Sequence, residues 1–151
     1  MKLRASRNFF CAAVVALVAS CSQEDSAEHQ VRAVIAHAEE RAEARDVGDL
    51  AALISADYSD QRGFDKKELT SYLRGWFVLH PSVNLLVRIE SLEFPADNLA
   101  RAEITVGMLG SRQANRADES PDLAAELEQL EVELLNEDGE WRVLRADRQR
   151  E

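Results

Sequence analysis

The sequence has little cysteine and little histidine. Its two cysteines, Cys11 and Cys21, both lie in the first 21 residues. We therefore expect no disulfide within the folded domain and no Cys-rich metal site. The three histidines, His29, His37 and His80, show no HxxxH spacing, and we expect neither a metal site nor a cofactor. The stability of the domain must come from packing.

Positive charge is also scarce. The chain has 18 Lys and Arg residues against 28 Asp and Glu residues, a net charge of −10. The first twenty residues contain three basic residues and no acidic one, so the remainder carries 15 basic and 28 acidic side chains, a net of −13. Such a surface repels phosphate backbones, and nucleic acid is not an expected partner.

No apolar run is long enough to form a stable transmembrane helix. The most apolar segment, Phe9 to Val18, has ten residues, whereas a spanning helix needs roughly 20 at a rise of about 1.5 Å each. Three basic residues precede this segment and two small residues follow it. This order is typical of a secretory signal, and we expect residues 1–20 to be removed as a signal peptide.

The four residues Val18-Ala19-Ser20-Cys21 resemble the lipobox of bacterial lipoproteins. In that family the cysteine thiol receives a diacylglyceryl group, cleavage leaves the cysteine first, and its amine is then acylated. The resemblance implies that lipidated Cys21 anchors the protein stably on a membrane. Ser22 follows instead of aspartate, which implies the periplasmic face of the outer membrane in the cell envelope. The alternative is an ordinary cysteine after a plain secretory cleavage site.

Residues 21–29 are polar and acidic, and we interpret them as a tether. Beyond them, apolar residues at helical spacing predict three helices. Asp49 is the expected cap of the second helix, and Asp65 with Glu68 forms a capping-box pattern at the start of the third. The three helices are expected over about residues 31–48, 50–54 and 65–80.

The sequence from Val83 onward is typical of strands. Apolar residues change their parity within the first segment, which predicts a β-bulge near Glu90 or Ser91. Residues 127–135 alternate as a strand, although leucines from position 123 also fit a helix, and Asn136 to Gly139 is a hairpin signal. The expected strands are 83–94, 99–109, 127–135 and 141–144, with a turn at 95–98 and an exposed loop at 110–122.

Three helices followed by antiparallel strands predict an α+β domain over residues 30–148. The order of "EARDVGDLAALISADYS", "DKKELTSYLRGW", "LLVRIESLEF", "ARAEITVGM" and "NEDGEWRVLRAD" resembles the nuclear transport factor 2 superfamily, which includes SnoaL-like polyketide cyclases and ketosteroid isomerases. The resemblance implies a cone in which three N-terminal helices pack on a curved antiparallel sheet of about four strands. Members use the enclosed pocket as an active site, a ligand site or a packed core, so the fold does not choose the function.

Tyr72, Trp76 and His80 are spaced four residues apart, so they share one face of the third predicted helix. We expect these three residues to line the pocket. The alternative is that the two aromatic rings belong to the core and that His80 sits near the carbonyl groups at the helix C-terminus.

Asp57, Tyr58 and Asp60 bring two carboxylates and a phenol into one loop, and with His80 they are the candidates for acid-base chemistry. An isomerase-like site requires such groups on the first helix and on inward strand positions. The apolar stripe of the first helix carries no tyrosine, and the polar strand residues are expected to form a solvated face. Those residues are Arg88, Glu90, Glu93, Arg101, Glu103 and Thr105.

The leading hypothesis is a lipid-anchored extracytoplasmic domain that binds a small apolar ligand or a protein partner and catalyses nothing. An alternative is a SnoaL-like isomerase, cyclase or hydratase with acid-base chemistry in the cone pocket. A second alternative is a structural homodimer or a component of envelope assembly.

We expect Cys21→Ala to move the protein from the membrane to the soluble fraction, because no acyl chain can then be attached. The measurement is immunoblotting of membrane and soluble fractions after expression of the precursor. Cys11→Ala is the matched control and should remain on the membrane. Unchanged membrane association of Cys21→Ala would show that lipidation is not its cause.

Overall fold

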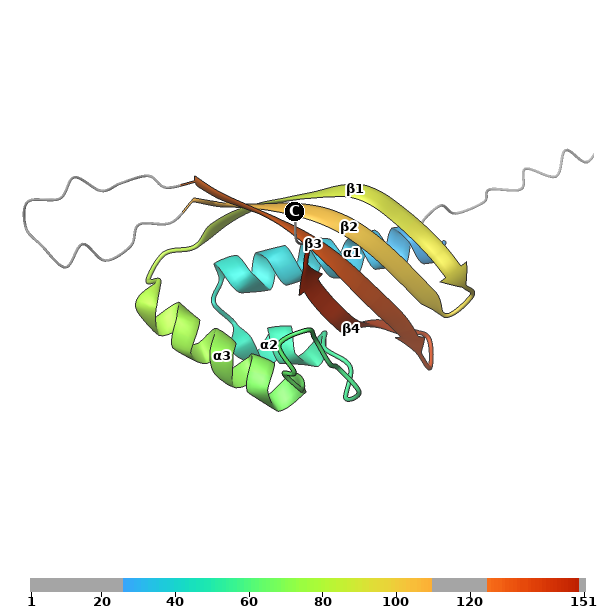
Figure 1. Ribbon diagram of the computed structural model, residues 1–151, viewed down its shortest axis with the longest axis horizontal. Coiled ribbons are helices and arrows are strands. Elements are labelled where there is room, and N and C mark those ends of the chain that lie inside the picture. The colour runs from blue at the N-terminus through green and yellow to red at the C-terminus, as the bar shows by residue number, and fades with distance from the viewer. Residues whose placement is uncertain (1–25, 110–124, 150–151) are drawn as a thin grey trace, which may run out of the picture.

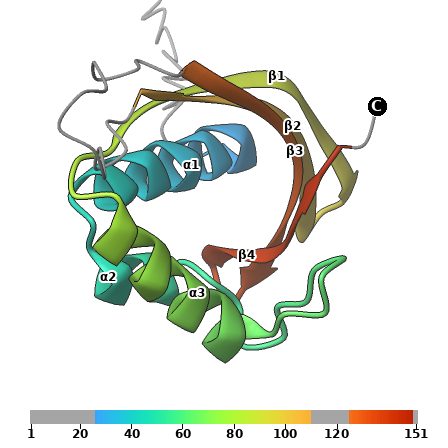
Figure 2. The ribbon, with the colours of Figure 1, turned by 60° about the vertical axis from the view of Figure 1, so that its left-hand side comes forward.

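The computed structural model describes residues 26–109 and 125–149. Three helices precede four strands, and the strands form one antiparallel sheet in the order β1-β2-β3-β4. The sheet curves around α1, while α2 and α3 lie on the same concave side (Figures 1 and 2). The predicted α+β architecture is confirmed. The elements are α1 (Ala27–Glu43), α2 (Val47–Ala52), α3 (Lys66–Leu79), β1 (Asn84–Ala96), β2 (Leu99–Leu109), β3 (Ala125–Glu137) and β4 (Glu140–Arg148).

The first two helices begin earlier than the sequence predicted. Ser26 caps α1 by accepting a hydrogen bond from the His29 amide, so the end of the predicted tether is helical. Arg45, at φ 59°, breaks the chain direction after α1. Asp46, and not Asp49, then caps α2, since its side chain accepts from the Asp49 amide at 3.0 Å. A left-handed residue allowed the helix to start three residues sooner.

The third helix follows the prediction closely. Asp65 and Glu68 form the predicted capping box, each side chain accepting from the other's backbone amide. At the other end, Arg45 donates to the carbonyl oxygens of Phe77 at 2.7 Å and Pro81 at 3.2 Å. These bonds satisfy carbonyl groups that have no partner within a helix, and they tie the α1–α2 corner to the end of α3.

The strands confirm the predicted bulge and hairpin. Pairing of β1 with β2 shifts register between Ile89 and Ser91. Asp138 and Gly139, at φ 54° and 94°, form the turn between β3 and β4, as such two-residue loops require. β3 is a strand from Ala125, so the helical alternative was wrong there, while residues 123–124 and the predicted loop 110–122 lie outside the described residues.

Part of each edge of the sheet is covered by other parts of the chain. On β1, the amides of Leu85 and Val87 donate to the carboxylates of Glu43 and Glu39 of α1, at 2.8 and 3.0 Å. On β4, Val143 exchanges backbone hydrogen bonds with the segment 53–55. Unpaired strand edges invite pairing with another chain, and these contacts occupy the start of β1 and the middle of β4.

The core has two parts. One joins α1 to the sheet through Val31 and Ile35, which pack with Ala100, Ala102 and Leu134 among others. The other joins the helices to the start of β1 through the buried residues Leu50, Phe77 and Val83. Among the described helices, none is both long and apolar enough to cross a bilayer.

Leu134→Ala should lower the free energy of unfolding by about 2–5 kcal/mol, because it removes buried methyl groups and leaves a cavity. Leu134 is 0% exposed. Leu127→Ala on the same strand is the control, since Leu127 is 75% exposed and its truncation should change the value by less than about 0.5 kcal/mol. Urea unfolding followed by circular dichroism measures both, and equal losses would contradict this assignment of the core.

Candidate functional site

A cavity of about 700 Å³ lies between α3 and the concave face of the sheet. Its walls are mainly apolar, and its size falls within the range of about 300–1,000 Å³ that is typical of small-molecule sites. The apolar walls include Leu69, Leu73, Trp76 and Phe77 of α3 and Val106, Met108 and Leu130 of the strands.

Of the three residues on the predicted third helix that were expected to line the pocket, two do so in the structure. Tyr72 and Trp76 line the cavity, whereas His80 is not among its lining residues. His80 is the C-terminal cap of α3, its Nδ1 lies 2.8 Å from the Trp76 carbonyl oxygen, and its ring stacks on the Trp76 ring with centroids 4.0 Å apart. The alternative placement of His80 near carbonyl groups at the helix end therefore describes the structure.

Asp60 organises the polar end of the cavity from the loop between α2 and α3. Its carboxylate is only 1% exposed and accepts five hydrogen bonds. One oxygen accepts from the amides of Arg62 and Phe64, and the other accepts from the Tyr58 hydroxyl and from Nε and Nη2 of Arg62. A buried carboxylate is tolerated only when such partners replace water.

These contacts set the ionisation of the loop. Burial opposes the charged form of Asp60, but the hydrogen bonds from Phe64 and Arg62 and the Arg62 charge outweigh it and lower the pKa of Asp60. Burial, then the Asp60 charge and hydrogen bond, raise the pKa of the Tyr58 hydroxyl. At neutral pH the loop therefore holds an ionised carboxylate and a neutral phenol.

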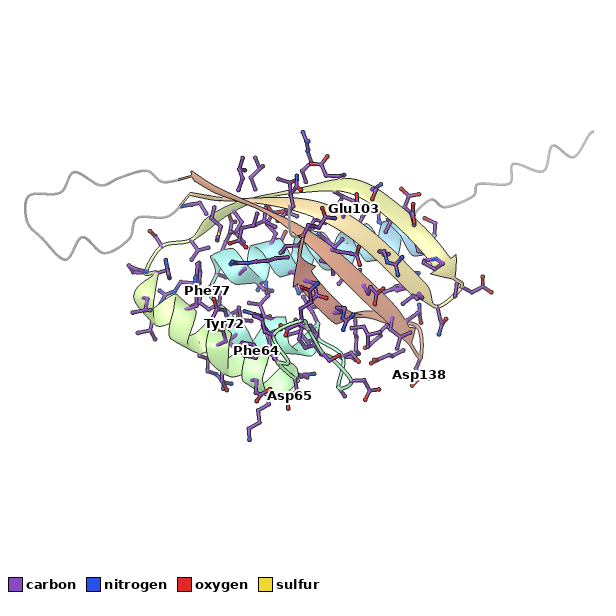
Figure 3. The ribbon with its side chains drawn as sticks, viewed as in Figure 1. Phe64, Asp65, Tyr72, Phe77, Glu103 and Asp138 are labelled. Carbon is purple, nitrogen blue, oxygen red and sulfur yellow. The ribbon has the colours of Figure 1, made fainter. Side chains whose placement is uncertain are left out.

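Arg62 lies at the cavity wall and is held on two sides. Its guanidinium is 2.9 Å from Asp60 and is centred 4.4 Å from the Phe64 ring and 5.0 Å from the Tyr72 ring. The Phe64 and Tyr72 rings contact each other, with centroids 5.9 Å apart, beside α3 (Figure 3). Cation–π contacts of this kind fix the guanidinium in place.

The strands contribute two further carboxylates to the wall, and each has a partner. Asp147 accepts from the Gln61 amide at 2.7 Å and lies 3.3 Å from Arg145. Glu128 pairs with Arg148 at 2.6 Å. Both carboxylates belong to the cavity lining.

Of the four candidates for acid-base chemistry, Tyr58 lines the cavity and is hydrogen-bonded to Asp60, whereas Asp57 and His80 do not line it. Asp57 is exposed and is not a lining residue. The Tyr58 hydroxyl already donates a hydrogen bond to Asp60. Arg62 and Asp147 were not predicted as wall residues, although Asp60 followed three residues later by Gly63 is a recognisable signal of a turn in which an aspartate side chain caps the backbone.

No three His, Cys, Asp or Glu side chains within residues 26–109 and 125–149 are placed together to hold a metal ion. Among the described residues, the cavity wall combines apolar side chains with a few hydrogen-bonding groups.

No family model matches this sequence, and no curated protein sequence matches it either. Solved structures do match. A candidate scytalone dehydratase from Novosphingobium aromaticivorans superposes with a TM-score of 0.70 at 14% identity, over 81% of this chain and 82% of the other. A candidate dehydratase of the NTF2-like family from Streptomyces avermitilis gives 0.68 at 14%, over 80% and 93%.

The chain has the NTF2-like fold. A third structure, the Kfla4162 protein from Kribbella flavida, agrees, with a TM-score of 0.70 at 11% identity over 80% of this chain and 88% of that one. The cone shape implied by the sequence resemblance is thereby confirmed. At such low identities the likeness concerns the NTF2-like fold alone, because one fold carries many functions.

Asp60→Asn should lower the free energy of unfolding at pH 7 by about 1–3 kcal/mol, because Arg62 loses its buried partner. The pKa of Asp60 is lower in the folded chain, so its ionised form stabilises the fold above its ordinary pKa near 3.8. This stabilisation is lost as the pH falls through the folded pKa. The difference from wild type should therefore shrink in urea unfolding repeated at about pH 3.

Asp57→Asn, in the same loop but exposed, is the control and should unfold at the wild-type urea midpoint at pH 7. A constant Asp60→Asn difference between the two pH values would contradict the ionised state assigned to Asp60.

Proposed function

We propose that this protein is a lipid-anchored, extracytoplasmic domain of NTF2-like fold that binds a small, mainly apolar ligand and catalyses no reaction. The cavity of about 700 Å³ is the observation that carries the proposal. A domain of this fold that used its cone only as a packed core would fill the space with side chains.

The composition of the wall supports binding of an apolar body with a polar end. α3 and the strands supply aliphatic and aromatic side chains, while Arg62, Asp147 and Glu128 lie among the polar lining residues. Ligand sites commonly combine a large apolar surface with a few polar groups that orient the molecule.

The state of the charged groups supports a non-catalytic role. General acid-base catalysis needs a group whose pKa lies near the working pH and whose proton is free to move. The pKa of Asp60 is lowered and that of Tyr58 is raised. Asp147 and Glu128 each lie against an arginine. The carboxylates of the lining are therefore paired with arginines, and neither is arranged as a proton donor or acceptor for a ligand.

The location part of the proposal rests on the first 22 residues. Basic residues, a short apolar segment and the lipobox-like sequence ending at Cys21 follow one another in the order that lipoproteins use. An anionic leaflet would repel an anchored domain of net negative charge, and the short segment that follows Cys21 would serve as the tether between them.

Filling the cavity should weaken binding of an apolar ligand. Ala146 lines the cavity, and we expect Ala146→Phe in the full chain carrying Cys21→Ala to weaken binding of the neutral dye Nile red at least tenfold, because the ring occupies the ligand's space. Leu73→Trp, on the opposite wall, should act in the same way. Fluorescence titration of the dye measures the affinities.

Ala36→Phe is the matched control, since Ala36 is exposed on α1, and it should bind as the parent does. Urea unfolding of each variant verifies that the fold is retained. Equal dye binding by the parent and both filled variants would contradict the cavity as the site. Conversion of a bound small molecule into a product would contradict the non-catalytic part and favour the SnoaL-like alternative.

A further inference from the structure

Arg62 retains hydrogen-bonding capacity at the cavity wall. Its Nε and Nη2 groups donate to Asp60, while its Nη1 group makes no hydrogen bond with any described residue. The Tyr72 hydroxyl and the indole N–H of Trp76, both on lining residues, also have no hydrogen-bond partner among the described residues. A ligand with an acceptor oxygen would satisfy such donors.

The charge of Arg62 is already matched. Asp60 lies 2.9 Å from the guanidinium, and its lowered pKa keeps it ionised at neutral pH. Asp147 and Glu128, which the strands contribute to the lining, are matched in turn by Arg145 and Arg148. An anionic head group would therefore lose its hydration without meeting an unmatched cation, whereas a neutral oxygen loses much less.

The donor is also held in place before a ligand arrives. Two aromatic rings, Phe64 and Tyr72, flank the guanidinium. Gly63, at φ 78°, turns the chain so that the amide of Phe64 donates to Asp60, which holds the Phe64 ring beside Arg62. A donor that is already ordered costs less conformational entropy on binding and discriminates more sharply among ligands.

We infer that the Asp60–Arg62 pair determines ligand specificity: it offers directed hydrogen-bond donors without net charge, and so selects uncharged apolar molecules bearing an acceptor oxygen over their carboxylate analogues. This inference rests on the proposed function, because it concerns the ligand of the same cavity. Arg62 is the specificity-determining residue, and Asp60 is the residue that positions and neutralises it.

Three probes built on one ring system test this selection. They are 2-ethylnaphthalene, with no acceptor, 2-acetylnaphthalene, with a neutral acceptor, and 2-naphthoate, with an anionic one. Competition with Nile red on the full chain carrying Cys21→Ala gives their affinities. We expect 2-acetylnaphthalene to bind about fivefold more tightly than 2-ethylnaphthalene, and 2-naphthoate to bind most weakly.

Two substitutions separate the effect of the hydrogen-bond donors of Arg62 from the effect of its charge. Arg62→Met keeps an apolar chain but removes the guanidinium donors. The preference for 2-acetylnaphthalene over 2-ethylnaphthalene should then fall from about fivefold to about twofold or less, since only the Tyr72 and Trp76 donors remain. Asp60→Asn leaves the Arg62 charge unmatched and should raise the affinity for 2-naphthoate at least tenfold. Arg74→Met is the control, because it removes the same charge from an exposed position on α3 outside the lining, and it should keep the parental order of affinities.

The outcomes distinguish this inference from the proposed function. If none of the probes or the dye binds, both fail. If 2-ethylnaphthalene binds but 2-acetylnaphthalene gains nothing, or if Arg62→Met keeps the full preference, the specificity inference alone is overturned. Tightest binding of 2-naphthoate by the parent would also overturn it. Should Asp60→Asn fail to fold, the comparison of Arg62→Met with Arg74→Met decides the matter.

Discussion

The close packing of α1 against the middle of the sheet is the contact on which the rest of the structure depends. Ala100 and Ala102 of β2 are fully buried beneath Val31 and Ile35 of α1. Their small side chains let the helix approach the sheet, and register shifts in β1 and between β3 and β4 let the strands bend around it. The sheet thus becomes a cone (Figure 2).

The same contact explains where the cavity lies. Among the described residues of α1, only Ala42, near the end of the helix, lines the cavity. Beyond it the chain turns through Arg45 into α2, and α3 lies on the concave side of the sheet (Figure 2). Arg45 holds the end of α3 by donating to the carbonyl oxygens of Phe77 and Pro81. α3 therefore forms one wall of the cavity, and α1 does not extend into the space between α3 and the strands.

The arrangement of charged groups at the polar end of the cavity follows from the free-energy cost of burying the Asp60 carboxylate. Asp60 is almost completely removed from water and persists because five donors replace the lost hydration. Satisfying Asp60 in turn fixes Arg62 and withdraws its net charge from the cavity. The acidic character of the chain is used similarly elsewhere, since Glu39 and Glu43 occupy the free edge of β1.

The sequence by itself determined the local elements of this protein. Helical spacing, the Asp65 capping box, the bulge after Ile89 and the turn at Gly139 depend on residues a few positions apart, and they could be predicted. Even there, the predicted cap of α2 was wrong. Asp46 and Asp49 are equally able to cap a helix, and the left-handed conformation of Arg45 decided between them.

Only the tertiary structure decided the site. The Asp147 carboxylate reaches the Gln61 amide across 86 positions of sequence, and no local pattern contains such a contact. Helical spacing placed His80 on the face of Trp76, but the helix ends at that point and His80 stacks on the indole outside the lining. The volume of the cavity depends on how far α3 stands from the sheet, which is set by packing over the whole domain.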